Sequence, residues 1–337
     1  MTSILKLSKL AIAAALGFAA FASPAVAQVA PEFSNSKIVV IEEDAGDRGY
    51  WTTTFDTFPP DDKRKPMAEQ RSQIRLQMME RRVLEEYAEF LSPLRLPHTL
   101  KLFASDCGGK NWDSPYYNPY IHAINMCYSF FAASNKDADY LLDLQAKGKL
   151  WTPVSREQYV AGLFTAVLMH ETGHALFDQL DIPVFGREED GADEVAAFLA
   201  LQFNKETART IIKGFAYMWA LSGDPRTQAM DVDDPNYPKD PDKQCWVDPF
   251  CAFSDEHGTS SQRLYNTLCI AYGGDPATFQ DFVDSGWLPP ERAKNCGKEY
   301  QQIKFAFEKT ILPFVDQEQM AKVRDRQWIQ PAELQEK

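Results

Sequence analysis

Histidine is scarce in this sequence, and clustered positive charge is missing. Only 5 of the 337 residues are histidine, and two of them, His170 and His174, lie four residues apart. Lysine and arginine number 35 against 48 acidic residues and form no basic run, which argues against nucleic-acid binding because a polyphosphate partner needs clustered positive charge. With 45% hydrophobic and 12% aromatic residues the chain can build a core, which excludes an intrinsically disordered chain.

Long apolar runs are absent after residue 27, so we expect no integral membrane segment in the mature chain. The first 27 residues are typical of a signal peptide, with Lys6 and Lys9 ahead of an apolar stretch over residues 10–22. That stretch is short for a membrane span, and residues 25–27 form a small-x-small cleavage site. We therefore expect cleavage after Ala27 and a secreted or periplasmic protein.

The Cys-x-x-Cys motif is also absent, which argues against a cysteine-based zinc site. An exported protein meets an oxidising environment, so we expect the six cysteines to form disulfides. Six cysteines allow fifteen pairings, and the sequence alone does not choose among them. Local spacing favours Cys107 with Cys127 across a hairpin, Cys245 with Cys251 around a small loop, and Cys269 with Cys296 between two helices.

The hydrophobic pattern predicts one mostly helical domain over residues 67–315. Thr99–Ala104 and Tyr120–Tyr128 are expected to be the two strands of a hairpin. A capping-box sequence at Ser155 then begins the strongest predicted helix. Other helices are expected over residues 67–91, 137–150, 188–221 with a break near Asn204, 260–271, 276–284 and 290–312.

Three segments lie outside this helical pattern. Residues 28–66 form an extended lead-in with a β-prone patch at 38–41, and residues 316–337 form a C-terminal tail. Residues 222–244 are rich in proline and aspartate, and a loop of this length is expected to be functional or mobile. Its acidic residues do not follow the spacing of an EF-hand, so calcium binding is disfavoured.

The chemistry of the chain points to residues 170–174, which read His-Glu-Thr-Gly-His inside the strongest predicted helix. Residues four apart differ by about 40° around a helix axis, so His170 and His174 leave the same face and can share a metal ion. Glu171 lies beside them, where it can act as a general base without being a ligand. Two core histidines are the alternative, but each would need a buried polar partner.

A catalytic zinc ion needs a third protein ligand and a position left open for water. The next predicted helix offers three candidates: Glu188, Glu189 and Glu194. We favour Glu189 because Asp193, one turn further along that face, could accept an N–H from a ligand imidazole and orient it. Small residues on the same helix would allow close approach to the histidine helix. A solvated acidic helix N-terminus is the alternative to a ligand.

Two stretches of sequence carry a resemblance to known proteins: MHETGHALFD at 169–178 and GREEDGADEVAAF at 186–198. They resemble a bacterial family described as putative zinc metallopeptidases and otherwise known only as a domain of unknown function. The resemblance extends over about residues 70–315. It includes Cys107-Gly108, Asn111 and Cys127-Tyr128, then Asp255-Glu256-His257, Gln262-Arg263, Asn266, Cys269, Pro276 and Cys296.

The chain is also similar, more distantly, to the gluzincins, which carry HExxH followed by ExxxD. The CAAX-prenyl-protease lineage of gluzincins carries ExxAD, which residues 189–193 match at each position. Thermolysin-like enzymes place their glutamate twenty residues beyond the second histidine, a spacing that falls on Glu194. Glu194 therefore stays open as an alternative ligand.

The motif and the resemblance together imply a zincin-like α+β fold, with a small hairpin or sheet ahead of the HExxH helix. They imply an exported zinc-dependent peptidase acting on peptide or protein substrates, with Zn²⁺ bound by His170, His174 and Glu189. Glu171 is then the general base, and the likeness to gluzincins suggests that His257 stabilises an oxyanion. A structural role at a helix entry is the alternative for His257. Two other functions stay open: an envelope protein that binds zinc without proteolysis, and a zinc hydrolase of non-peptide amides or esters.

Overall fold

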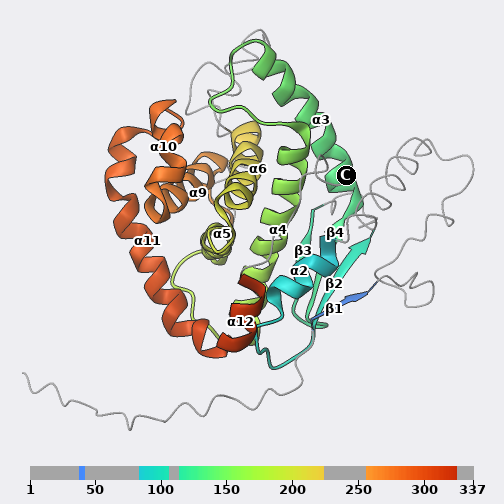
Figure 1. Cartoon of the computed structure of the whole chain (residues 1–337). Helices are drawn as coiled ribbons and strands as arrows, with labels where there is room; N and C mark the ends of the chain where they lie inside the picture. The colour runs from blue at the N-terminus through green and yellow to red at the C-terminus, as the bar shows by residue number, and fades with distance from the viewer. Residues whose placement is uncertain (1–37, 42–82, 106–113, 224–255, 325–337) are drawn as a thin grey trace, which may run out of the picture. The chain divides into compact units, whose positions relative to one another are not determined.

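The computed structural model describes residues 38–41, 83–105, 114–223 and 256–324, all within the unit Phe33–Lys337. These residues form a mostly helical α+β fold with one small sheet, which confirms the predicted fold class at that level (Figure 1). The predicted signal peptide and nearly all of the acidic loop lie outside the described residues. No helix in the described part is long and apolar enough to cross a membrane.

The helices occupy most of the positions that the hydrophobic pattern predicts. The predicted break near Asn204 is present, and the side chain of Asn204 accepts a hydrogen bond from the Thr207 N–H at 3.0 Å. The α-helices are α2 (Val83–Leu91), α3 (Tyr128–Ala146), α4 (Arg156–Gln179), α5 (Glu188–Ala200), α6 (Lys205–Gly223), α9 (Ser260–Gly274), α10 (Pro276–Asp284), α11 (Pro290–Thr310) and α12 (Gln317–Arg324), with a 3₁₀ turn, η4 (Leu312–Phe314), before α12.

The sheet has four strands in the order β1-β2-β4-β3. Its strands are β1 (Ile38–Ile41), β2 (Leu100–Ser105), β3 (Tyr116–Asn118) and β4 (Ala123–Cys127). The expected hairpin between the two predicted strands is wrong, because β2 and β4 pair in parallel, with Leu102 opposite Ile124. The 17 residues between them (106–122) are long enough for the crossover that a parallel pair requires. The antiparallel partner of β4 is β3, which lies between the two predicted strands in the sequence.

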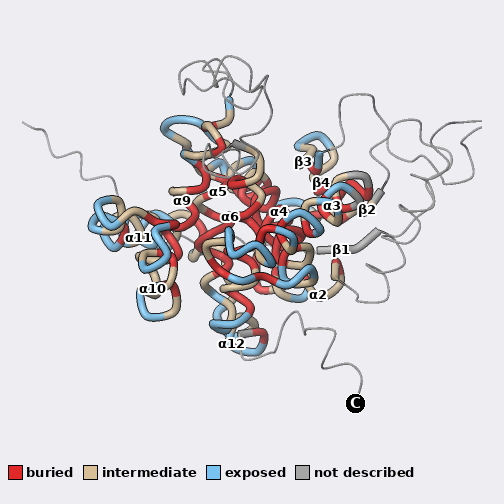
Figure 2. The backbone as a smooth tube through the Cα atoms, turned by 90° about the horizontal axis from the view of Figure 1, so that it is seen from above, coloured by how far each residue is buried: buried red, intermediate tan, exposed pale blue. Residues whose placement is uncertain are grey.

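Helix α4 lies between the sheet and most of the other helices. Figure 1 shows the strands and α3 on one side of α4, with α5, α6 and α9–α11 on the other. The helix begins at Ser155, whose hydroxyl accepts from the Gln158 N–H while the Gln158 side chain accepts from the Ser155 N–H, so the predicted capping box is present. Because α4 is covered from both sides, its middle is buried almost all round (Figure 2).

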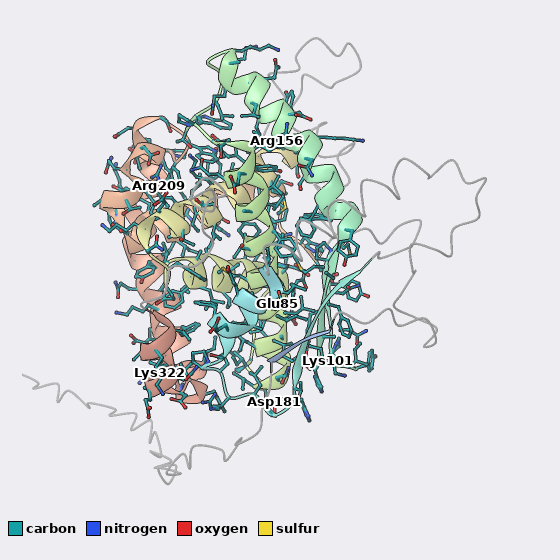
Figure 3. All side chains as sticks on the ribbon, turned by 45° about the vertical axis from the view of Figure 1, so that its right-hand side comes forward. Glu85, Lys101, Arg156, Asp181, Arg209 and Lys322 are labelled. Atoms are coloured by element: carbon teal, nitrogen blue, oxygen red, sulfur yellow. A yellow bond between two sulfur atoms is a disulfide. The ribbon has the colours of Figure 1, made fainter. Side chains whose placement is uncertain are left out.

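Glycines allow α4 to pack closely against its neighbours. Cβ atoms added at Gly162 and Gly214 would clash with the backbone of the facing helix, at Thr210 and Leu163 respectively. The exposed start of α4 is tied to α3 by Arg156, which donates to the Asn135 carbonyl at 3.0 Å (Figure 3). These contacts hold the first part of the HExxH helix against α3 and α6.

The segment that follows α2 contacts the segment that precedes α12. Arg95 pairs with Asp316 at 2.5 Å, and Leu94 forms an isolated β-bridge with Val315. The segment predicted as a C-terminal tail therefore begins with an ordered helix, α12, that follows this contact. The fold extends past residue 315 as a result.

A disulfide joins Cys269 of α9 to Cys296 of α11, the pairing that the spacing favoured between two C-terminal helices. Cys127, at the end of β4, is also disulfide-bonded. The proposed partner Cys107 and the pair Cys245–Cys251 lie outside the described residues, so those two pairings stay predictions.

Candidate metal centre

Helix α4 places the two histidines of the motif one turn apart with their rings converging. The Nε2 atoms of His170 and His174 lie 3.2 Å from each other. Both side chains are largely buried, with 10% and 14% of their surface exposed. The helical spacing thus produces two nitrogen donors that face one point.

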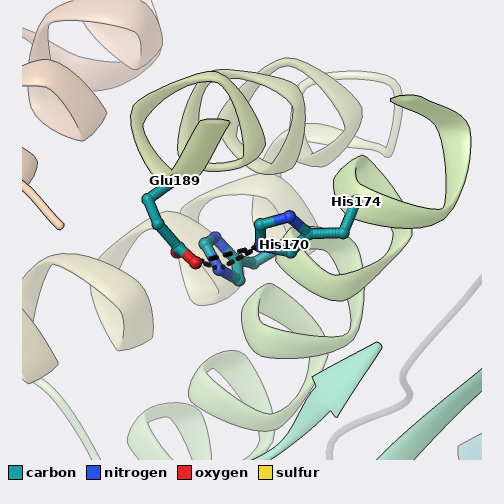
Figure 4. Close-up of side chains that lie close together, drawn as sticks. All are labelled: His170, His174 and Glu189. Atoms are coloured by element: carbon teal, nitrogen blue, oxygen red, sulfur yellow. Dashed lines mark hydrogen bonds and ion pairs between the residues drawn. The ribbon is translucent and has the colours of Figure 1, made fainter. Parts of the chain in front are cut away.

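Helix α5 brings the carboxylate of Glu189 to the same point (Figure 4). Its Oε2 is 3.1 Å from His170 Nε2, and its Oε1 is 3.5 Å from His174 Nε2. One donor atom from each of these three residues lies within 4.8 Å of the other two. Of the three candidate glutamates, Glu189 is the one that the structure brings to both histidines.

The other ring nitrogen of each histidine is held by a carboxylate of α5. His170 Nδ1 lies 2.8 Å from Asp193 Oδ1, and His174 Nδ1 lies 2.8 Å from Glu188 Oε1. An ionised carboxylate only accepts hydrogen bonds, so Nδ1 carries the proton in both rings and Nε2 is left as the donor atom for a metal. Glu188 and Asp193 thus fix the tautomers.

The electrostatics of this cluster favour a bound cation. Burial lowers the pKa of His170, but hydrogen bonds to Asp193 and Glu189 outweigh it and raise the pKa to about 10. Burial raises the pKa of Glu189, yet the close imidazole groups of His170, His174 and His257 hold it far below its usual range. Several carboxylates around two histidines therefore create a negative site that takes up positive charge.

The donor set fits a divalent metal such as zinc. Two imidazole nitrogens and one carboxylate make up a three-ligand catalytic set that leaves a fourth position open. Glu189 Oε2 is buried but makes no hydrogen bond of good geometry. A buried carboxylate oxygen is costly to leave without a partner, and a metal ion at this point would supply one.

Glu171 lies beside the donor atoms without joining them. Burial raises the pKa of its carboxyl group, while the neighbouring His170 and His174 and a hydrogen bond from the Tyr117 N–H of β3 act in the opposite direction. A buried carboxylate whose pKa is raised accepts a proton more readily than an exposed one. The edge strand of the sheet thus contacts the residue that we expect to be the base.

A family model described as "Putative metallopeptidase" matches residues 64–311, which is most of the chain. The chain belongs to this metallopeptidase family. Membership implies a metal ion, together with peptidase activity on peptide or protein substrates. No curated protein and no solved structure matches the chain.

His257 also reaches the centre of this metallopeptidase. Its Nε2 is 3.1 Å from Glu189 Oε2, and its backbone carbonyl accepts from Arg187 Nη1 at 3.2 Å. His257, Glu256 and Glu189 form a second group of donors within 4.8 Å of one another, but His257 is not part of the group with His170 and His174. His257 thus lies next to the candidate ligands without being one of the converging set.

Glu194, the alternative ligand, is in neither of the two donor groups found among the described residues. Burial raises its pKa to about 7, and the nearby carboxylates of Asp190, Asp193 and Glu299 raise it as well. Its surroundings are therefore other acids and not the imidazoles.

The sequence did not single out two residues that complete the site. Arg263 of α9 donates to both oxygens of Asp193, and Tyr117 of β3 donates its N–H to Glu171. Neither has a spacing relationship to HExxH along the chain. The one available signal for Arg263 was the family resemblance at Gln262-Arg263, and Arg263 lies three residues after the predicted helix start at 260.

Proposed function

We propose that this member of the metallopeptidase family is an exported, zinc-dependent peptidase of the gluzincin type with a zincin-like fold. The observation that carries the proposal is the convergence of His170 Nε2, His174 Nε2 and the Glu189 carboxylate next to a buried Glu171. His170, His174 and Glu189 would hold Zn²⁺. When bound, the ion lowers the pKa of water and polarises a carbonyl oxygen.

The protein's own groups account for the proton transfers. Glu171 takes a proton from the attacking water, because its buried carboxylate binds a proton more readily than an exposed one. It then passes this proton to the leaving amine. Asp193 and Glu188 keep the Nδ1 protons on the ligand histidines, so each Nε2 stays directed to the metal.

His257 is proposed to donate a hydrogen bond to the carbonyl oxygen of the scissile bond as negative charge develops there. Its Nε2 lies next to Glu189, and 42% of its side chain is exposed, so a substrate can reach it. Removal of one such donor typically costs about 100- to 1,000-fold in kcat. We expect His257→Ala to lower kcat with little change in zinc content.

The sheet supports peptide substrates over small amides. Strand β3 is the last strand in the order β1-β2-β4-β3, and Tyr117 of this strand contacts Glu171. An extended peptide can add to such an edge through main-chain hydrogen bonds, which positions its carbonyl near the base. We propose that substrates align along β3.

Export is supported by the signal-like N-terminus and by the disulfide between Cys269 and Cys296. Disulfides persist outside the cytosol and are rare inside it. Determination of the N-terminal residue of the protein recovered from cells tests this point, and we expect the mature chain to begin at Gln28.

The decisive experiment combines metal analysis with Glu171→Gln. We expect the purified wild type to bind one zinc ion per chain and to hydrolyse casein or peptide-library substrates until a chelator is added. Glu171→Gln should keep its zinc and lose about 100- to 10,000-fold in kcat.

Glu157→Gln is the matched control, since it makes the same change on the first turn of the same helix. It should keep both zinc and activity. Wild-type rates in zinc-loaded Glu171→Gln would exclude the base role, and a wild type that holds zinc but cleaves no peptide would favour the non-proteolytic alternative.

A further inference from the structure

Arg263, in the first turn of α9, is a buried arginine whose guanidinium group contacts Asp193 beside the metal centre. Only 5% of the residue is exposed. Its Nε donates to Asp193 Oδ2 at 2.5 Å, and its Nη2 donates to Asp193 Oδ1 at 2.8 Å. A two-point contact of this kind fixes the plane of a carboxylate as well as its position.

The guanidinium group is held on its other sides too. Its Cζ lies 3.7 Å from the ring centroid of Trp219 on α6, which is a close cation–π contact. Its Nη2 is 3.8 Å from Glu189 Oε2. Arg263 thus joins α9 to both α5 and α6, and it approaches one candidate ligand directly.

Asp193 connects this arginine to the other helix of the metal centre. Its Oδ1 lies 2.8 Å from Arg263 Nη2 and also 2.8 Å from His170 Nδ1. The orientation of the His170 ring therefore depends on where Asp193 is held. Since His170 is on α4, the series Trp219, Arg263, Asp193, His170 links four helices.

We propose that Arg263 is a positioning residue, which with Trp219 fixes the Asp193 carboxylate so that His170 Nε2 points at the bound metal. The inference rests on the proposed function, because only a metal at His170, His174 and Glu189 gives that alignment a purpose. Loss of an outer partner of a metal ligand typically costs about 10- to 100-fold in metal affinity.

If Arg263 acted only through its charge, its removal would change the metal affinity in the opposite direction. Arg263 places a positive charge near Glu189, so its removal alone would strengthen the binding of a cation. Arg263→Lys separates the two roles, because lysine keeps the charge but cannot contact both oxygens of Asp193 in one plane. The positioning role predicts weaker zinc binding in Arg263→Lys, and the electrostatic role predicts wild-type binding.

A second arginine offers a matched control. Arg209 of α6, labelled in Figure 3, makes a two-point contact with Asp281 of α10 at 2.8 and 2.7 Å. It also lies over the rings of Phe279 and Phe282 at 5.8 and 5.7 Å. Arg209→Lys thus breaks the same kind of contact between helices, away from the HExxH and Glu189 side chains.

The test uses the full chain and needs no activity measurement. Zinc affinity is measured by competition with a chromophoric chelator. The geometry of the ligands is followed in the visible absorption of Co²⁺ added to the protein after its metal has been removed. We expect Arg263→Lys to bind zinc about 10-fold or more weakly and to change the Co²⁺ spectrum. Arg209→Lys should match the wild type in both.

The result that overturns the proposal is wild-type affinity with a wild-type Co²⁺ spectrum in Arg263→Lys. An equal loss in Arg209→Lys would overturn it as well, since general loosening of the fold would then explain both. If Arg263→Lys does not fold, Trp219→Leu serves instead and should lower zinc affinity while Asp193 keeps its arginine. Failure of the proposed function is distinct, because there the wild type itself would bind no zinc.

Discussion

Gly173 of α4 lies so close to Ala192 of α5 that a Cβ atom added at Gly173 would be 2.8 Å from the Cα of Ala192. Gly173 is inside the HExxH motif, and Ala192 follows Glu189 by three residues. Because Gly173 has no side chain, α4, which carries two candidate ligands, can lie close to α5, which carries the third. Close backbone contact allows short side chains from both helices to reach one ion.

Gly173→Ala should weaken zinc binding by pushing α5 away from α4. Alanine is the better helix former by about 1 kcal/mol, so propensity alone would stabilise the variant. The added methyl group meets backbone, however, and overpacking of this kind costs about 1–3 kcal/mol. We expect a lower free energy of unfolding in urea and a zinc affinity reduced about 10-fold, a loss of the size seen when a ligand's support is disturbed.

Gly297→Ala on α11 is the control for this substitution. A Cβ atom there would have no neighbour within 4 Å, so only helix propensity changes. The variant should gain about 0.5–1 kcal/mol of stability with unchanged zinc affinity. Wild-type zinc affinity in Gly173→Ala would show that the α4–α5 spacing does not control the centre.

The choice between Glu189 and Glu194 is decided by two isosteric variants. Glu189 is within reach of both histidines, whereas Glu194 is surrounded by other acids. Glu189→Gln should lower zinc affinity by at least about 100-fold, more than the loss of an outer partner, while Glu194→Gln should stay within about twofold. Chelator competition measures both, and the reverse order would reassign the third ligand.

Glu194 should make stability depend on pH. Its pKa rises from 4.5 to about 7 on folding, mainly through burial. Between these two values the folded chain binds more protons than the unfolded chain, so the contribution of Glu194 to stability falls as pH rises through this window. Glu194→Gln removes that ionisation and should raise the melting temperature relative to wild type at pH 8, with little difference at pH 4.5. An equal difference in melting temperature at both pH values would rule out the ionisation of Glu194 as its cause.

The local parts of the fold could be predicted from the sequence because their signals are local. The capping box at Ser155 marks the start of α4, and the four-residue spacing of the histidines places their rings on one face. The proline at 276 likewise marks the start of α10. Each of these depends on residues within a turn or two of one another.

The parts that the sequence did not predict depend on contacts between distant segments. The relative direction of the strands was not predicted, because the hydrophobic pattern does not show whether β2 and β4 pair in parallel or antiparallel. Strand β3 has three residues, too few for a clear alternation. The role of Arg263 was not predicted either, because its partner Asp193 lies 70 positions away in the sequence.

Cys269 and Cys296 join the helix that carries Arg263 to α11, and their removal should lower stability without changing the centre. The bond spans 27 positions, for which the loop-entropy model gives about 3–4 kcal/mol. Cys269→Ser with Cys296→Ser, made together so that no single thiol is left, should lower the melting temperature by roughly 10 °C.

The helices α9 and α11 also contact each other through Gly273, where an added Cβ would clash with the Cys296 carbonyl. Packing at this point should hold Arg263 in place in the folded state even without the disulfide. We therefore expect the double serine variant, measured well below its melting temperature, to bind zinc like the wild type. Weaker zinc binding at that temperature would mean that the disulfide itself sets the position of α9, and with it the position of Arg263.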